Sequence, residues 1–168
     1  MDDLAKVLPQ PRRTILSSRS EYLAAFDELV AVTRRELRVF DPDCAQLELN
    51  VPGRHEQLRQ FLLASRDNRL FVAVHDPEHL KRHCPRMLRL VAEFSATIAI
   101  HQTDGEATQA QDCFVLADME HFVRRTVAAQ PRGVYSINEY KDARSIRERY
   151  DEIWECSVPA ISATTLGL

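Results

Sequence analysis

The stretch Leu70-Phe71-Val72-Ala73-Val74 consists of five consecutive apolar residues. This length suits a β-strand and falls far short of the ~20 apolar residues that a membrane-spanning helix needs. A strand that is apolar on both faces is typical of the inside of a sheet that helices cover on each side. We therefore expect an α/β protein, and no stretch of the sequence predicts a membrane span.

Helical and strand patterns alternate on both sides of this strand. Upstream, Ser18-Arg19-Ser20-Glu21 is a capping box that opens an amphipathic helix. Downstream, Cys84-Pro85 interrupts a helical stretch, because proline cannot continue a helix. The patterns predict helices over 18–33, 53–65, 78–94 and from 142 onward, and strands over 37–40, 70–74, 97–100, 113–116, 121–123 and 134–137.

This order predicts the fold class and the domain organisation. Strands that are separated by helices require right-handed crossovers, so we expect an α/β fold with a mostly parallel mixed sheet, an antiparallel cluster towards its end and helices on both faces. The 168 residues can bury one core but not two. We predict an N-terminal arm over 1–17, a single domain over 18–156 and a C-terminal tail over 157–168, because neither end shows a sustained period.

Composition excludes several classes of protein. The 22 basic and 25 acidic residues give a net charge of -3, which argues against a general nucleic-acid binder. The N-terminus is acidic and lacks the apolar core of a secretory signal. The four cysteines are far apart and form no CxxC pair, so we expect reduced thiols and a cytoplasmic location.

The order of elements, together with the closing Tyr150-Asp151-Glu152-Ile153-Trp154, resembles one half of the phospholipase D superfamily fold. The resemblance covers about residues 20–156. The specific motif of that superfamily is H-x-K-x4-D. In active members the histidine attacks phosphorus, the lysine holds the phosphoryl oxygens, and the aspartate orients the histidine.

The strand that matches this motif reads Gln111-Asp112-Cys113-Phe114-Val115-Leu116-Ala117-Asp118. Asp118 fits the acid, but Gln111 stands at the position of the histidine and Cys113 at that of the lysine. An amide is not a nucleophile, and a thiol supplies no fixed positive charge. The resemblance therefore implies a degenerate site without a cofactor, and a non-catalytic binding or interaction module whose ligand the motif does not name.

The resemblance also implies a partner. Active members of the superfamily bring two halves together, with the site at the seam. A single half would bury that face by forming a homodimer or by docking on another protein domain. Bacterial sequences of this kind are sometimes attached to a GNAT-like acetyltransferase, which is one candidate partner. The four glycines here form no acetyl-CoA loop, so that activity is not expected in this chain.

An alternative site lies at the strand edge near Asp118. His121, Arg124 and Arg125 follow it, and Asn138 follows the next strand, so these residues could form a cationic pocket for a phosphate or carboxylate group. Arg124 and Arg125 point to opposite faces of a strand, so at most one can face such a pocket. The alternative function is an enzyme or an anion-binding site of another kind at the Asp118/His121 edge. Surface ion pairs and turn chemistry explain the same residues.

A cluster of histidines raises the question of a metal site. His79 and His83 are four residues apart and share a helix face, which is the spacing of two zinc ligands, and Asp76 could be a third ligand. However, Leu80 stands where the HExxH motif has its glutamate. A solvated helix face explains the same residues, and we expect no metal.

Overall fold

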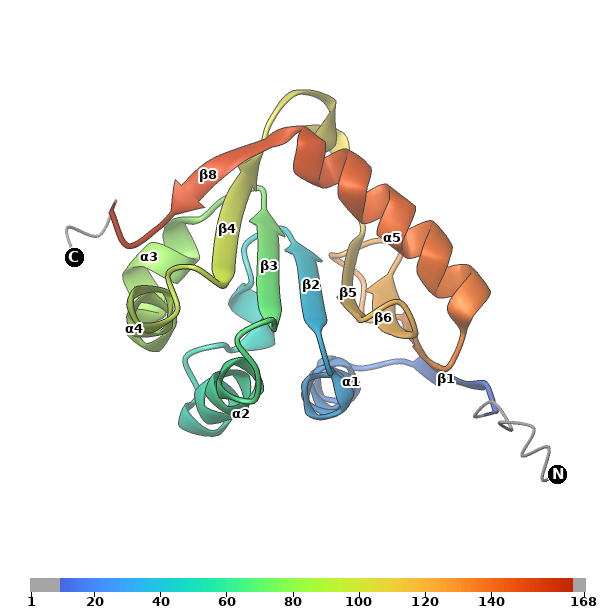
Figure 1. Cartoon of the computed structure of the whole chain (residues 1–168). Coiled ribbons are helices and arrows are strands. Elements are labelled where there is room, and N and C mark those ends of the chain that lie inside the picture. The colour runs from blue at the N-terminus through green and yellow to red at the C-terminus, as the bar shows by residue number, and fades with distance from the viewer. Residues whose placement is uncertain (1–9, 165–168) are drawn as a thin grey trace, which may run out of the picture.

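The apolar stretch 70–74 lies in the interior of one eight-stranded sheet in the computed structural model, which describes residues 10–164. Five α-helices and two short 3-10 helices accompany the sheet in the described residues (Figure 1). The strands are β1 (Arg12–Leu16), β2 (Glu36–Asp41), β3 (Arg69–Val74), β4 (Ile98–Thr103), β5 (Cys113–Ala117), β6 (His121–Arg125), β7 (Gly133–Ile137) and β8 (Ser157–Ile161). The helices are α1 (Arg19–Val32), α2 (Pro52–Leu63), α3 (Glu78–His83), α4 (Pro85–Glu93) and α5 (Tyr140–Glu155), with η1 (Ala45–Leu47) and η2 (Gly105–Gln109).

The predicted helices and strands between residues 18 and 156 are present in the predicted order. Ser18 caps α1 and accepts a hydrogen bond from the backbone N–H of Glu21. The helical stretch after β3 is broken into α3 and α4 at Cys84, and Pro85 occupies the first turn of α4, where its missing N–H costs nothing.

The mixed α/β class is confirmed, but the expected majority of parallel strand pairs is wrong. The sheet order is β1-β7-β6-β5-β2-β3-β4-β8. Two pairs are parallel, β2 with β3 and β3 with β4, and the other described pairs are antiparallel. The reason is that no α-helix separates β4, β5, β6 and β7 along the chain, and short connections favour antiparallel pairing.

Both ends of the chain join the sheet, which corrects the predicted arm and tail. β1 pairs with β7 and β8 pairs with β4, so these two strands form the two edges. Sequence patterns missed them because each five-residue strand buries one hydrophobic side chain, Leu16 in β1 and Ile161 in β8. Residues 1–9 of the predicted arm and 165–168 of the predicted tail lie outside the described residues.

Helices cover both faces of the sheet, as predicted. Helices α1 to α4 pack on one face, which we call the α1 face, and α5 packs on the other, which we call the α5 face (Figure 1). Side chains alternate between the faces along each strand. On β5, Cys113 and Val115 belong to the core of the α1 face, whereas Phe114 and Leu116 belong to that of the α5 face. Within residues 10–164, no helix is both long and apolar enough to cross a membrane.

The close approach of β7 to β6 depends on Gly133. A Cβ atom at this position would lie 2.8 Å from the backbone oxygen of Arg124. We expect Gly133→Ala to lower the free energy of unfolding by about 2 kcal/mol, because backbone atoms cannot move aside cheaply. Urea denaturation of the purified protein measures this effect.

Gly53, in the first turn of α2, is the matched control. A Cβ atom there would meet nothing within 4 Å. Gly53→Ala should therefore raise the free energy of unfolding by about 0.5–1 kcal/mol, through helix propensity and a less flexible unfolded chain. Equal effects at the two glycines would contradict the close approach at Gly133.

Candidate functional site

Cys113, at the position of the motif lysine, is part of the hydrophobic core. Its side chain is buried on the α1 face, and its Sγ lies 3.6 Å from the hydroxyl of Tyr22. Burial, followed by the nearby charge of Asp41, raises the pKa of Cys113 to about 11. The thiol is therefore protonated at neutral pH, so it supplies neither a charge nor a reactive thiolate.

Asp118, at the position of the motif acid, holds a turn. It has a positive φ of 58° and follows β5 directly. Its carboxylate accepts hydrogen bonds from the backbone N–H groups of Arg34, Arg35 and Glu36, at 3.0, 2.8 and 3.0 Å. Asp118 thereby fixes the connection between α1 and β2.

His75, which follows β3, lies next to the segment that leads to Gln111. Its Nε2 lies 2.7 Å from the carbonyl oxygen of Ala110, and its Nδ1 lies 2.6 Å from the hydroxyl of Thr103. A carbonyl only accepts, so Nε2 carries the proton and Nδ1 accepts from the hydroxyl. The ring also meets Phe40 of the α5 face edge to face, at a centroid distance of 5.3 Å.

A buried cation does lie near the motif position on the α1 face. Arg125 pairs with Cys113 across the β5–β6 ladder and is 3% exposed. Its guanidinium carbon lies 4.2 Å from the centre of the Tyr22 ring, and Nη1 donates a hydrogen bond to the side-chain oxygen of Gln46. This face therefore has a positive charge, from a different strand than the motif uses, but no free imidazole.

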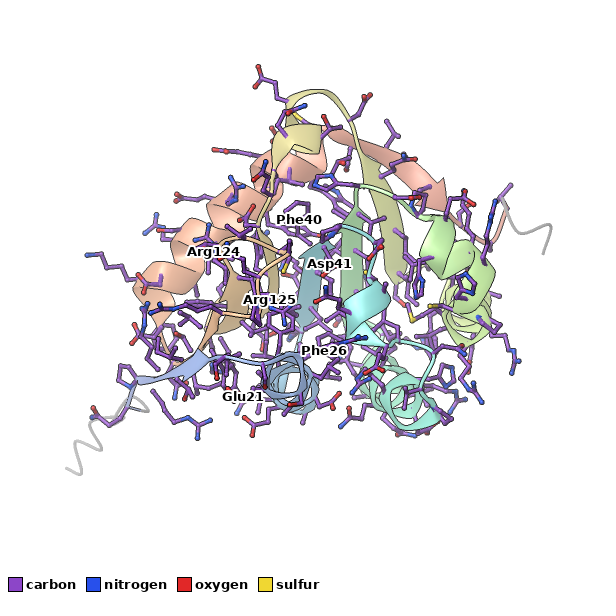
Figure 2. All side chains as sticks on the ribbon, turned by 180° about the vertical axis from the view of Figure 1, so that it is seen from behind. Glu21, Phe26, Phe40, Asp41, Arg124 and Arg125 are labelled. Atoms are coloured by element: carbon purple, nitrogen blue, oxygen red, sulfur yellow. The ribbon has the colours of Figure 1, made fainter. Side chains whose placement is uncertain are left out.

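Asp41, at the end of β2, is a buried acid on the same face. Its carboxylate accepts hydrogen bonds from the backbone N–H groups of Asp43 and Cys44. Burial raises its pKa to about 6, against the ordinary 3.8. Figure 2 labels Asp41 and Arg125, which both lie in the interior of the molecule.

The four predicted anion-binding residues do not form one pocket. His121 and Asn138 meet at one end of β6, where the backbone N–H of Asn138 donates to Nδ1 of His121 at 3.0 Å. Arg124 and Arg125 lie at the other end of this strand. The expected common pocket is therefore wrong, because a five-residue strand separates its two ends.

Arg124 and Arg125 point to opposite faces of β6, and Figure 2 labels both. Arg124 lines a cavity next to α5, and Arg125 lies in the α1-face core. The physical reason is the alternation of side chains along a strand.

His121 is held as a structural residue. Its Nδ1 accepts the N–H of Asn138, so Nε2 carries the proton, 3.4 Å from a carboxylate oxygen of Glu120. Burial lowers the pKa of His121, which favours this neutral form. Neither ring nitrogen has a free lone pair, so the ring cannot act as a general base in this arrangement.

The histidines of α3 do not combine with Asp76. The rings of His79 and His83 lie 5.2 Å apart, whereas the carboxylate of Asp76 accepts the backbone N–H of Glu78. Among residues 10–164, the structure contains no group of three or more His, Cys, Asp or Glu side chains that could hold a metal ion.

Asp112 forms a second buried polar cluster, which sequence patterns missed. Its carboxylate is 4% exposed and accepts two hydrogen bonds from Arg149, at 2.8 and 2.6 Å, and one from Arg124 at 3.1 Å. These arginines counteract the effect of burial and hold the pKa of Asp112 below its ordinary value. The only sequence signal was an acid at the start of an apolar strand.

Residues 18–166 match the family model described as a domain of unknown function, DUF7931. The chain belongs to this family. A search of curated proteins finds no match.

Solved structures show the fold that this DUF7931 domain shares. The phospholipase D family member Nuc from Salmonella typhimurium aligns with a TM-score of 0.61 and 13% identity, over 91% of this chain and 100% of that one. NucT from Helicobacter pylori aligns with a TM-score of 0.62 and 8% identity, over 90% and 100%. TrmBL2, an archaeal chromatin protein, aligns with a TM-score of 0.66 and 12% identity. The alignment covers 94% of this chain but only 58% of that one. The fold is phospholipase D-like.

The buried carboxyl of Asp41 predicts a pH dependence of stability. Its pKa is raised from 3.8 to about 6 in the folded protein, so folding favours the protonated form. The resulting stabilisation of the folded state is complete below the pKa that Asp41 has in the unfolded chain, and it is lost as the pH rises through about 6. Asp41→Asn, whose amide oxygen can still accept both N–H groups, should be more stable than the native protein at pH 7 by about 3 kcal/mol.

Urea denaturation at pH 4, 5, 6 and 7 measures this difference. The control is Asp67→Asn, which replaces an exposed acid 3.6 Å from Arg35. Parallel pH profiles for the native protein and Asp41→Asn would contradict the raised pKa.

The turn-holding role of Asp118 predicts a loss of stability on truncation. Asp118→Ala leaves three backbone N–H groups without their acceptor and places alanine at a positive φ. We expect a loss of about 2–4 kcal/mol in the free energy of unfolding. Asp118→Asn should lose less, because asparagine tolerates positive φ and keeps one acceptor oxygen. Equal thermal stability of all three proteins would refute this role.

Proposed function

We propose that this protein is a non-catalytic phospholipase D-like domain that acts as a binding or interaction module in the bacterial cytoplasm. The observation that carries the proposal is the environment of Cys113. The residue at the position of the motif lysine lies 1% exposed in the core with a neutral thiol. A substrate phosphate therefore has no cation at this position.

The other motif positions support the same proposal. Gln111 has no nucleophilic nitrogen, and the carboxylate of Asp118 is used by three backbone amides. His75 and His121 have both ring nitrogens engaged, and Arg125 is a cation without a nucleophile beside it. The geometry does not favour the alternative of an enzyme at the Asp118/His121 edge.

For the partner, we propose a second copy of the chain or a different protein domain, such as a GNAT-like acetyltransferase. The fold corresponds to the whole length of Nuc and NucT. By resemblance, such a unit pairs with another across the edge that carries the motif. In this chain Gln111 lies at that edge and is exposed, which leaves it open to a partner.

A hydrolysis assay tests the absence of catalysis. The purified protein is incubated with bis(p-nitrophenyl) phosphate and, separately, with single-stranded DNA. We expect no more p-nitrophenol and no more DNA fragments than in buffer alone. Hydrolysis that is lost in His75→Gln or His121→Gln would overturn the proposal, whereas hydrolysis that persists in both variants indicates a contaminant.

Light scattering tests the partner. A homodimer has twice the 19.3 kDa mass of the chain. A chain that remains monomeric at 100 µM would contradict the homodimer, and the interaction would then require a different domain.

A further inference from the structure

We infer that the cavity between α5 and the β1–β7–β6 part of the sheet binds an oxyanion carried on a small apolar group. This inference rests on the proposed binding function and names the class of ligand. The cavity has a volume of about 320 Å³. Its wall combines three arginines, Arg13, Arg124 and Arg149, with two hydroxyl side chains and an apolar surface.

The charge of the wall favours an anion. One buried carboxylate, that of Asp112, holds the guanidinium groups of both Arg124 and Arg149. This cluster has two positive charges for one negative charge. Arg13 and Asp142 add a pair at 3.6 Å, which is neutral in sum. The cavity lining itself therefore contains three arginines and one acid, Asp142, which favours an anionic ligand.

One donor on the wall has no acceptor. The Nε of Arg124 is buried and makes no hydrogen bond to any of the residues that the structure describes. A buried donor without an acceptor costs about 1–3 kcal/mol. The guanidinium group of Arg124, which lines the cavity, presents its N–H donors in a planar fork that matches the oxygens of a phosphate or carboxylate group.

The remaining wall fits the rest of such a ligand. The hydroxyl groups of Thr126 and Ser145 can donate to oxygens of the anion, whereas Phe122, Val134 and Ile146 offer an apolar surface. Asp112 holds two arginines in place before the ligand arrives, so less side-chain entropy is lost on binding.

The cavity lies on the other side of the sheet from the degenerate motif. Asp112 stands between Gln111 and Cys113 in the sequence, and alternation along the strand places it towards α5. The sheet itself separates the cavity from Cys113 and Arg125. The inferred site is therefore not a remnant of the phosphodiesterase centre.

Isothermal titration calorimetry with phenyl phosphate tests the inference, with benzoate, inorganic phosphate and benzyl alcohol as the other probes. We expect phenyl phosphate or benzoate to bind in the submillimolar range, inorganic phosphate at least tenfold more weakly, and benzyl alcohol not at all. The stronger of the first two shows which oxyanion the site prefers.

Two variants locate the binding. Arg124→Gln removes the unpaired donor and one charge, and should weaken binding at least tenfold. Ser145→Trp fills the cavity without removing a charge, and should abolish binding even if the arginine variant is unstable. The control is Arg144→Gln, on the exposed side of α5, where the arginine pairs with Glu148. It removes the same charge and should leave binding unchanged.

Three results would overturn the inference: no heat from phenyl phosphate or benzoate at 10 mM, equal affinity in the native protein and Ser145→Trp, or equal weakening by Arg124→Gln and Arg144→Gln. Equal affinity for inorganic phosphate and phenyl phosphate would overturn the part played by the apolar wall. None of these results bears on catalysis, which the hydrolysis assay alone decides.

Discussion

Helices cover the sheet on both faces, and this constraint determines what its strands can do. All five residues of β5 are buried, because α1 packs on one side and α5 on the other. A strand in this position can carry a reactive polar group only where a partner or an opening is provided. Cys113 has no opening to solvent, and its thiol, which contacts the hydroxyl of Tyr22, is protonated within the core. The proposed absence of the motif chemistry and the packing of the core would then be two aspects of one arrangement.

The charges buried on the two faces are held in different ways. On the α5 face they are paired. Asp112 binds two arginines. The Nη1 of Arg38 lies 2.7 Å from a carboxylate oxygen of Glu36, and its guanidinium group lies over the ring of Phe71. On the α1 face Asp41 is stabilised by backbone amides, and Arg125 by an aromatic ring and an amide side chain. The pKa of Asp41 is raised to about 6, whereas that of Asp112 is held below its ordinary value. Of these two buried acids, the one on the α1 face is therefore the one that gains a proton first as the pH falls.

The sequence predicted the fold well where packing sets a period. The apolar stretch 70–74, the capping box at Ser18 and the break at Pro85 each led to the correct element. The edge strands β1 and β8 were missed, because an edge strand buries too few side chains to show a period. The share of antiparallel pairs was underestimated, because β5 pairs with β2 across the sheet and both edge strands pair antiparallel.

The site was harder to predict than the fold. Spacing correctly separated Arg124 from Arg125, but could not show that His121 lies at the far end of their strand from both. Nor could it show that Asp112 would bind both Arg124 and Arg149, which lie 12 and 37 positions away in the sequence. Such clusters depend on which elements pack together, so they become visible only once the sheet and α5 are assembled.

Helix α5 links the two margins of the sheet. It follows β7, the neighbour of one edge strand, and leads directly into β8, which is the other edge strand (Figure 1). Near its end Trp154 stacks on His101 of β4 at 3.8 Å and meets Phe71 of β3, whereas its first half packs near Phe122 of β6. The helix thus crosses the sheet diagonally and contacts strands near both of its edges. We therefore expect amide hydrogen exchange in the edge strands β1 and β8 to be coupled rather than independent.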